Sequence, residues 1–127
     1  MKEKIETLLR DTVSGLVTDG LLPRIDPQGV SVSIPTNKEF GDFATNVAMV
    51  TASRTKKRPR DIAEIVKRSL ETHSDLFERI EIAGPGFINI SLNPALWVNE
   101  LKDIVGQREN YGRSTYGAGK KVQVEFV

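Results

Sequence analysis

The 127-residue sequence has no cysteine and a single histidine, and each absence excludes a kind of chemistry. Without cysteine the chain forms no disulfide and offers no thiolate, which is compatible with a reducing compartment. A self-contained enzyme would need a nucleophile paired with a base, or a cluster of metal ligands. His73 alone supplies neither, so we interpret it as a polar residue that follows a helix.

Long apolar runs are also absent. No stretch approaches the roughly 20 apolar residues that cross a bilayer as a helix. The start, Met1-Lys2-Glu3-Lys4, lacks the apolar core of a signal peptide, so the cytoplasm is the expected location. The formal net charge of +1 argues against a protein that coats nucleic acid by bulk electrostatics. Length and composition fit one soluble domain with a sizeable core.

Four segments place apolar residues at helical spacing and predict amphipathic helices. Asp42 is expected to cap the second helix, and Pro59 and Asn93-Pro94 are expected to begin the third and fourth. The predicted buried stripes are Ile5, Leu8, Leu9, Thr12, Val13 and Leu16; Ala44, Val47, Ala48 and Ala52; Ile62, Ile65, Val66 and Leu70; and Trp97, Val98, Leu101, Ile104 and Val105.

Alternating residues predict strands near 30–35, 78–83 and 86–92. In the first, Val30, Val32 and Ile34 alternate with serines; in the second, Phe77, Arg79 and Glu81 alternate with Ile80 and Ile82. The turn Gly84-Pro85-Gly86 predicts a hairpin between the second and third strands. A further strand is expected to start at 122. The predicted fold class is α/β of the α+β type, a small antiparallel sheet with about four helices packed on one face.

The strand at 86–92 sorts two kinds of residue onto opposite faces. Ile88, Ile90 and Leu92 point to the core, whereas Phe87, Asn89 and Ser91 point the other way. An aromatic ring stacks on an unpaired base while an amide hydrogen-bonds the base edge, a combination typical of single-stranded RNA readers. The alternative is that Phe87 only closes the end of a core and that Asn89 serves a turn.

A basic run lies between the second and third predicted helices. Its members are Arg54, Lys56, Lys57, Arg58 and Arg60. Such a run is either a solvated surface or a patch that contacts phosphates.

Several short motifs together resemble the amino-terminal part of arginyl-tRNA synthetase. They are Gly41-Asp42-Phe43-Ala44-Thr45-Asn46, Gly84-Pro85-Gly86-Phe87-Ile88-Asn89, Tyr111-Gly112-Arg113 and Gly119-Lys120-Lys121-Val122-Gln123-Val124-Glu125-Phe126. The resemblance implies an additional α/β domain, here residues 1–110, followed at 111–127 by a connector and the first strand toward a class I catalytic core. The chain is then expected to be a fragment of a longer protein.

The resemblance also implies a function. The parent enzyme would attach arginine to tRNA(Arg) using ATP with magnesium, while this fragment would carry no catalytic residue, metal or cofactor. Its partners would be tRNA(Arg) and its own catalytic domain, and no membrane. Phe87 and Asn89 would contact an exposed D-loop nucleotide at the tRNA elbow. To this candidate site the residues themselves add Ser91, on the same face, and four members of the basic run as phosphate contacts: Arg54, Lys56, Lys57 and Arg58. The alternative is a structural or protein-interaction domain that docks on a catalytic core without reading a base.

Overall fold

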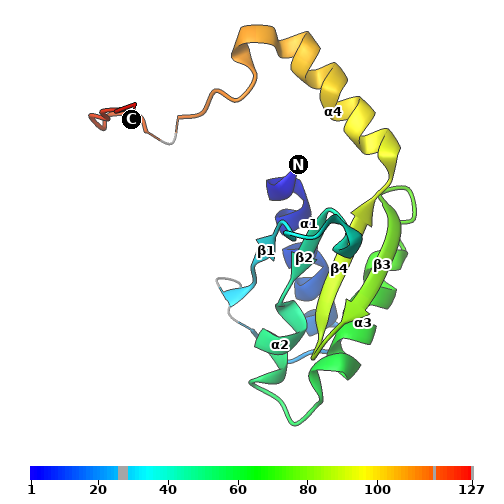
Figure 1. Cartoon of the computed structure of the whole chain (residues 1–127). Coiled ribbons are helices and arrows are strands. Elements are labelled where there is room, and N and C mark those ends of the chain that lie inside the picture. The colour runs from blue at the N-terminus through cyan, green and yellow to red at the C-terminus, as the bar shows by residue number, and fades with distance from the viewer. Residues whose placement is uncertain (26–28, 116, 127) are drawn as a thin grey trace.

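The computed structural model of the chain describes residues 1–25, 29–115 and 117–126, and its centre is one antiparallel sheet (Figure 1). The four strands run in the order β1-β2-β4-β3. Their bounds are β1 Val32–Ser33, β2 Phe43–Thr45, β3 Phe77–Ala83 and β4 Phe87–Leu92. The helices are α1 Lys2–Thr18, α2 Val47–Ala52, α3 Pro59–Glu71 and α4 Pro94–Gln107, with short 3-10 turns η2 Lys38–Phe40 and η3 Arg108–Asn110. The predicted fold class is confirmed.

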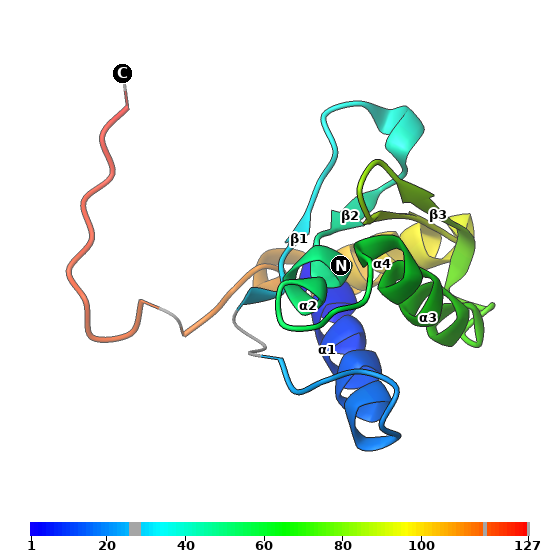
Figure 2. The same cartoon turned by 90° about the horizontal axis from the view of Figure 1, so that it is seen from below.

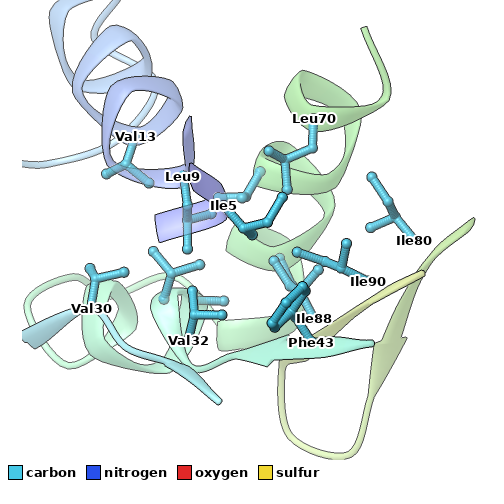
Figure 3. Packing of buried hydrophobic residues seen from close by; sticks show 14 of the residues in the cluster. Ile5, Leu9, Val13, Val30, Val32, Phe43, Leu70, Ile80, Ile88 and Ile90 are labelled. Carbon is cyan, nitrogen blue, oxygen red and sulfur yellow. The ribbon is translucent and has the colours of Figure 1, made fainter. Parts of the chain in front are cut away.

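Helices α1, α2 and α3 cover one face of the sheet, and the loop that contains η2 lies on the other side (Figure 2). Figure 3 shows the core between the helices and the sheet, to which α1 contributes Ile5, Leu9 and Val13. The inward residues of β4 and α3 are almost completely buried. They are Ile88, Ile90 and Leu92 on β4, and Ile62, Val66 and Leu70 on α3. The stripes predicted for the first and third helices therefore meet on a shared apolar surface.

The hairpin of β3 and β4 forms as predicted, with Ala83 opposite Phe87 and the Gly86 amide donating to the Ala83 carbonyl oxygen at 3.2 Å. The alternation of side chains in β3 differs from the prediction at Phe77. The ladder is irregular between Phe77 and Arg79, and Phe77 and Ile80 are both buried. A bulge shifts the alternation by one residue, so Phe77 faces the core instead of the side opposite Ile80.

The segment before α2 was predicted as a loop running into a helix, and this is wrong for residues 43–45. They form β2, which pairs with β1 on one side and β4 on the other. Asp42 does not cap α2. Its amide donates to the Ile90 carbonyl oxygen, and its Oδ2 accepts from the Leu92 amide, both at 2.8 Å. Ala44, predicted on a helix, lies on the open face of the sheet opposite Asn89. At the other side of β2, β1 is only two residues long, and Ile34, predicted to be inward, is 71% exposed.

Helix α4 begins as predicted, because Asn93 Oδ1 accepts from the Ala95 amide at 3.0 Å and Pro94 is the first helical residue. Its predicted buried stripe is wrong, since no residue of α4 is buried. The helix continues away from the end of β4 and does not lie on the sheet (Figure 1). The ring of Trp97 stacks on Phe43 at a centroid distance of 6.5 Å but stays 38% exposed.

Beyond η3, residues 111–115 and 117–126 contain no helix or strand. The strand expected from 122 is therefore absent over 122–126, where the backbone has no partner strand, and its last residue, 127, lies outside the described residues. The last regular element, η3, ends at Asn110. The division of the chain into 1–110 and 111–127 stays a prediction.

Candidate nucleic-acid interface

The face of the sheet opposite the helices carries the residues singled out in the sequence. Across this face Asn89 of β4 pairs with Ala44 of β2 and with Glu81 of β3. The predicted division of β4 is confirmed: Ile88 is fully buried on the helix side, and Phe87 is 41% exposed on the other. The ring of Phe87 is thus available to a ligand at the hairpin end of the sheet.

A hollow of about 240 Å³ opens on this face. It is lined by Pro35, Phe40, Ala44, Ala83, Gly84, Phe87 and Asn89. Ala44 and Ala83 leave room for the hollow above the sheet, because the alanine side chain is only a methyl group. Two phenyl rings, from Phe40 and Phe87, line the same hollow, and both are substantially exposed.

Asn89 differs from the two rings because it is only 8% exposed. Within the described part of the chain its carboxamide has no hydrogen bond, and no fully buried side-chain nitrogen or oxygen there lacks a partner. The amide group therefore reaches solvent through the hollow, where it offers both a donor and an acceptor. A group of this kind is able to hydrogen-bond the edge of a planar polar ligand.

Phe40 was not predicted from the sequence as a site residue. It ends η2, which Asn37 starts by accepting a hydrogen bond from the Glu39 amide at 3.0 Å. Phe40 is followed by Gly41, whose φ of 86° is a conformation that side chains other than glycine rarely adopt. A signal did exist in the sequence: the ring stands among polar residues, Asn37, Lys38 and Glu39, with no apolar periodicity to bury it.

Ser91 lies two residues further from the hairpin turn than Asn89, on the same face, and does not line the hollow. The backbone of Gly41 passes close to Ser91: a Cβ atom at Gly41 would lie 2.9 Å from Ser91 Oγ and 2.6 Å from the Ile90 carbonyl oxygen. Ser91 therefore supports the loop that carries Phe40, and its role in binding stays a prediction.

The basic run is connected to the hairpin turn. A guanidinium nitrogen of Arg60 donates to the Gly84 carbonyl oxygen at 3.1 Å. A Cβ atom at Gly86 would lie 2.9 Å from Pro59 Cβ, so the turn is seated on the start of α3. The start of α3, with Arg60, thereby lies beside the hairpin turn at the end of the sheet where Phe87 lies.

Members of the basic run differ in their surroundings. Arg58 makes two hydrogen bonds to the Asp61 carboxylate, Nε to Oδ2 at 2.9 Å and Nη2 to Oδ1 at 3.0 Å. These bonds raise the pKa of Arg58 and lower the pKa of Asp61. Arg54, Lys56 and Lys57 are exposed and form no ion pair with any described residue. Arg54, Lys56 and Lys57 are thus freer to contact an anion than Arg58, which already has a carboxylate partner.

Among the described residues no group of His, Cys, Asp or Glu is arranged to hold a metal ion. Over the same residues, no helix has the length and apolar character needed to cross a membrane.

By fold and site, the chain falls in the class of small α+β domains whose sheet has one helix-covered face and one open face with aromatic and amide side chains. Residues 3–92 match the family described as "Arginyl tRNA synthetase N terminal domain", and the chain belongs to this family. The resemblance noted in the sequence is therefore confirmed.

The relatives are much longer than this chain. It is 43% identical over 127 residues to the arginine–tRNA ligase of Citrifermentans bemidjiense and 46% identical over 127 residues to that of Thioalkalivibrio sulfidiphilus. All of this chain is covered in both matches, but only 23% and 22% of the relatives' length. The chain thus corresponds to an N-terminal portion of enzymes named arginine–tRNA ligase. A solved arginyl-tRNA synthetase of Plasmodium falciparum shares the fold, with a TM-score of 0.68, 18% identity and coverage of 81% of this chain and 18% of that one.

Proposed function

We infer that this chain is the tRNA-binding N-terminal domain of a longer arginine–tRNA ligase, and that it contacts the D-loop at the elbow of tRNA(Arg). The observation that carries this proposal is the exposed ring of Phe87 on the open face of the sheet, beside the carboxamide of Asn89, which hydrogen-bonds to no described residue. The parent enzyme attaches arginine to tRNA(Arg) using ATP with magnesium. The fragment supplies recognition only.

Each residue of the interface has a distinct part in the proposed contact. Phe87 stacks on an unpaired base, and Asn89 hydrogen-bonds the edge of that base. Lys56 and Lys57, on the loop before α3, contact phosphates without choosing a sequence. Ser91 and Gly41 hold the neighbouring loop in place. Family membership supports tRNA as the nucleic acid, since the relatives are tRNA ligases.

The direct test is a titration of the chain with a tRNA(Arg) transcript. Two control RNAs are needed: an unrelated folded RNA of similar size, and tRNA(Arg) whose unpaired D-loop bases are replaced one at a time by abasic sites. We expect tighter binding to tRNA(Arg) than to the unrelated RNA, with loss of the difference at one abasic position. Equal affinity for all of these RNAs would contradict the proposal.

A second candidate function, docking on the catalytic part of the same protein, is favoured by the exposed apolar residues of α4. Val98, Leu101 and Val105 are 50%, 60% and 71% exposed and repeat at intervals that place them on one side of the helix. A continuous apolar stripe of this kind is typical of an interaction surface. The occupant that fits is the remainder of the longer synthetase, because the relatives contain several times the length of this chain.

Docking is tested separately from RNA binding. Replacing Leu101 and Val105 by glutamate should weaken association of this chain with the separately produced remainder of the synthetase, while leaving tRNA affinity of the isolated chain unchanged. Undiminished association of the double variant would count against α4 as the docking helix. Loss of tRNA affinity in the double variant would mean that α4 belongs to the RNA interface.

A further inference from the structure

We propose that Phe40 is the second wall of a pocket for a single base, so that an unpaired base inserts between Phe40 and Phe87 with its edge toward Asn89. This inference rests on the proposed function and names a residue and a geometry that the proposal above does not need. Phe40 and Phe87 line one hollow, and Asn89 and two alanines complete its lining together with Pro35 and Gly84.

The position of Phe40 is set by its own loop and not by the core. Phe40 is 51% exposed, and η2 contains no buried residue. Two interactions hold the loop on β4: the Asp42 amide donates to the Ile90 carbonyl oxygen, and Asp42 Oδ2 accepts from the Leu92 amide. Between them and the ring lies Gly41, packed directly on the Ile90 carbonyl group and the Ser91 hydroxyl oxygen. The backbone next to Phe40 is therefore held over the open face of the sheet, although half of the surface of Phe40 stays in contact with water.

The size of the hollow indicates what it accepts. Pockets for drug-sized molecules are about 300–1,000 Å³, and this hollow is about 240 Å³. It suits one aromatic heterocycle and not a whole nucleotide, so the sugar and phosphate stay outside. The Arg60 contact to Gly84 brings the basic run to the hairpin end of the same hollow, where those phosphates would lie.

Two aromatic walls impose a stricter requirement than one. A single exposed ring can stack on a base that still has a neighbouring base on its other face, whereas a slot with rings on both sides takes only a base that has left its own stack. Asn89 then hydrogen-bonds the edge of the base that lies deepest in the slot. The site thus selects for an extruded, unpaired nucleotide and discriminates by edge chemistry at Asn89.

The experiment compares Phe40→Ala, Phe40→Leu, Phe40→Tyr and Phe87→Ala in titrations with tRNA(Arg). Phe40→Leu keeps apolar bulk without a ring, and Phe40→Tyr keeps the ring. We expect Phe40→Ala and Phe40→Leu to weaken binding roughly 5- to 150-fold, the usual range for one stacked base, and Phe40→Tyr to stay close to the parent. Leu21→Ala is the matched control, because Leu21 is 49% exposed and lies outside the hollow.

A second readout follows the base itself. With 2-aminopurine placed at each unpaired D-loop position in turn, binding should quench the fluorescence at one position, and Phe40→Ala and Phe87→Ala should each reduce that quenching. If Phe87→Ala weakens binding while Phe40→Ala and Phe40→Leu do not, the second wall is wrong and the proposed function stands. If neither ring matters, both fail. If Phe40→Leu binds as well as the parent, Phe40 acts by packing and the two-walled pocket is overturned.

Discussion

At the scale of single residues, Phe87 and Ile90 belong to the same strand but face opposite sides of the sheet. Ile90→Ala should reduce the free energy of unfolding by about 2–5 kcal/mol, because it leaves a cavity in a closely packed core. Phe87→Ala should leave that free energy nearly unchanged and cost about 1–3 kcal/mol of tRNA binding. Chemical denaturation and tRNA titration of both variants measure the two quantities.

The outcomes separate the two interpretations of Phe87 given by the sequence. If Phe87→Ala lowered the melting temperature as much as Ile90→Ala and left tRNA affinity untouched, Phe87 would be a core residue. Asn89→Ala extends the comparison, since losing a hydrogen-bonded edge should cost less affinity than losing the stack but relax the choice of base.

What the sequence could predict at this scale follows from periodicity. The alternation of β4 placed Phe87 and Ile88 on opposite faces, because side chains on any strand alternate. Phe40 escaped prediction, since its place depends on a glycine with positive φ and on hydrogen bonds from Asp42 to a distant strand. Such long-range contacts leave no regular spacing to detect.

At the scale of elements, the loop before α3 is expected to contribute affinity without sequence choice. Replacing Lys56, Lys57 and Arg58 by alanine should weaken binding to all RNAs similarly and make it less salt-dependent. Most of the effect should come from the lysines, because Arg58 is paired with Asp61. Titrations at several salt concentrations compare the Lys56/Lys57 double variant with Arg58→Ala. An unchanged salt slope in the double variant would identify the run as a solvated surface.

The junction between α1 and α4 gives a pH-dependent prediction. Glu100 accepts hydrogen bonds from Lys4 Nζ and from the Tyr111 hydroxyl, both at 3.0 Å. These bonds, with that from Lys4 the larger, lower the pKa of Glu100 below 4.5. A carboxylate whose pKa is lower in the folded than in the unfolded state stabilises the fold above the unfolded pKa, and this stabilisation is lost as pH falls through the folded pKa.

Glu100→Gln should therefore be less stable than the parent at neutral pH, and the difference should shrink as the pH falls below 4.5. Trp97 is the only tryptophan and lies on α4, so its fluorescence reports on this junction during urea unfolding between pH 7 and 3. A stability difference that stays constant over this range would show that the carboxylate charge is not what holds the two helices.

Element prediction succeeded where a local signal determined the structure. Pro59 and Asn93-Pro94 begin helices as expected, and the glycine-rich turn forms its hairpin. β2 was missed because it is only three residues long and is defined by its partners on both sides. The apolar spacing of α4 was identified correctly, but spacing predicts an apolar stripe and not the surface that covers it.

At the scale of the whole molecule, the prediction concerns activity. The chain spans only 23% of the length of a curated relative. The His-x-Gly-His signature expected of the class I catalytic core is absent from its sequence, which has a single histidine. The isolated chain should therefore support no arginine-dependent exchange between ATP and pyrophosphate and no transfer of arginine to tRNA. The longer synthetase assayed in parallel is the positive control. Exchange by the purified chain, free of contaminating synthetase, would overturn the proposal that it is a recognition domain.

Helix α4 projects from the body of the domain (Figure 1), so a small rotation at its attached end gives a larger displacement at its far end. Its 14 residues span about 21 Å, and among described residues its ties to the body lie near its first turns, at Trp97 and Glu100. A rotation of about ten degrees at this base would displace the far end of a helix of that length by about 4 Å. Under the proposed function, a substitution at Glu100 would change where a bound tRNA meets the rest of a synthetase without touching the RNA, and would alter aminoacylation while affinity for the tRNA elbow stayed constant.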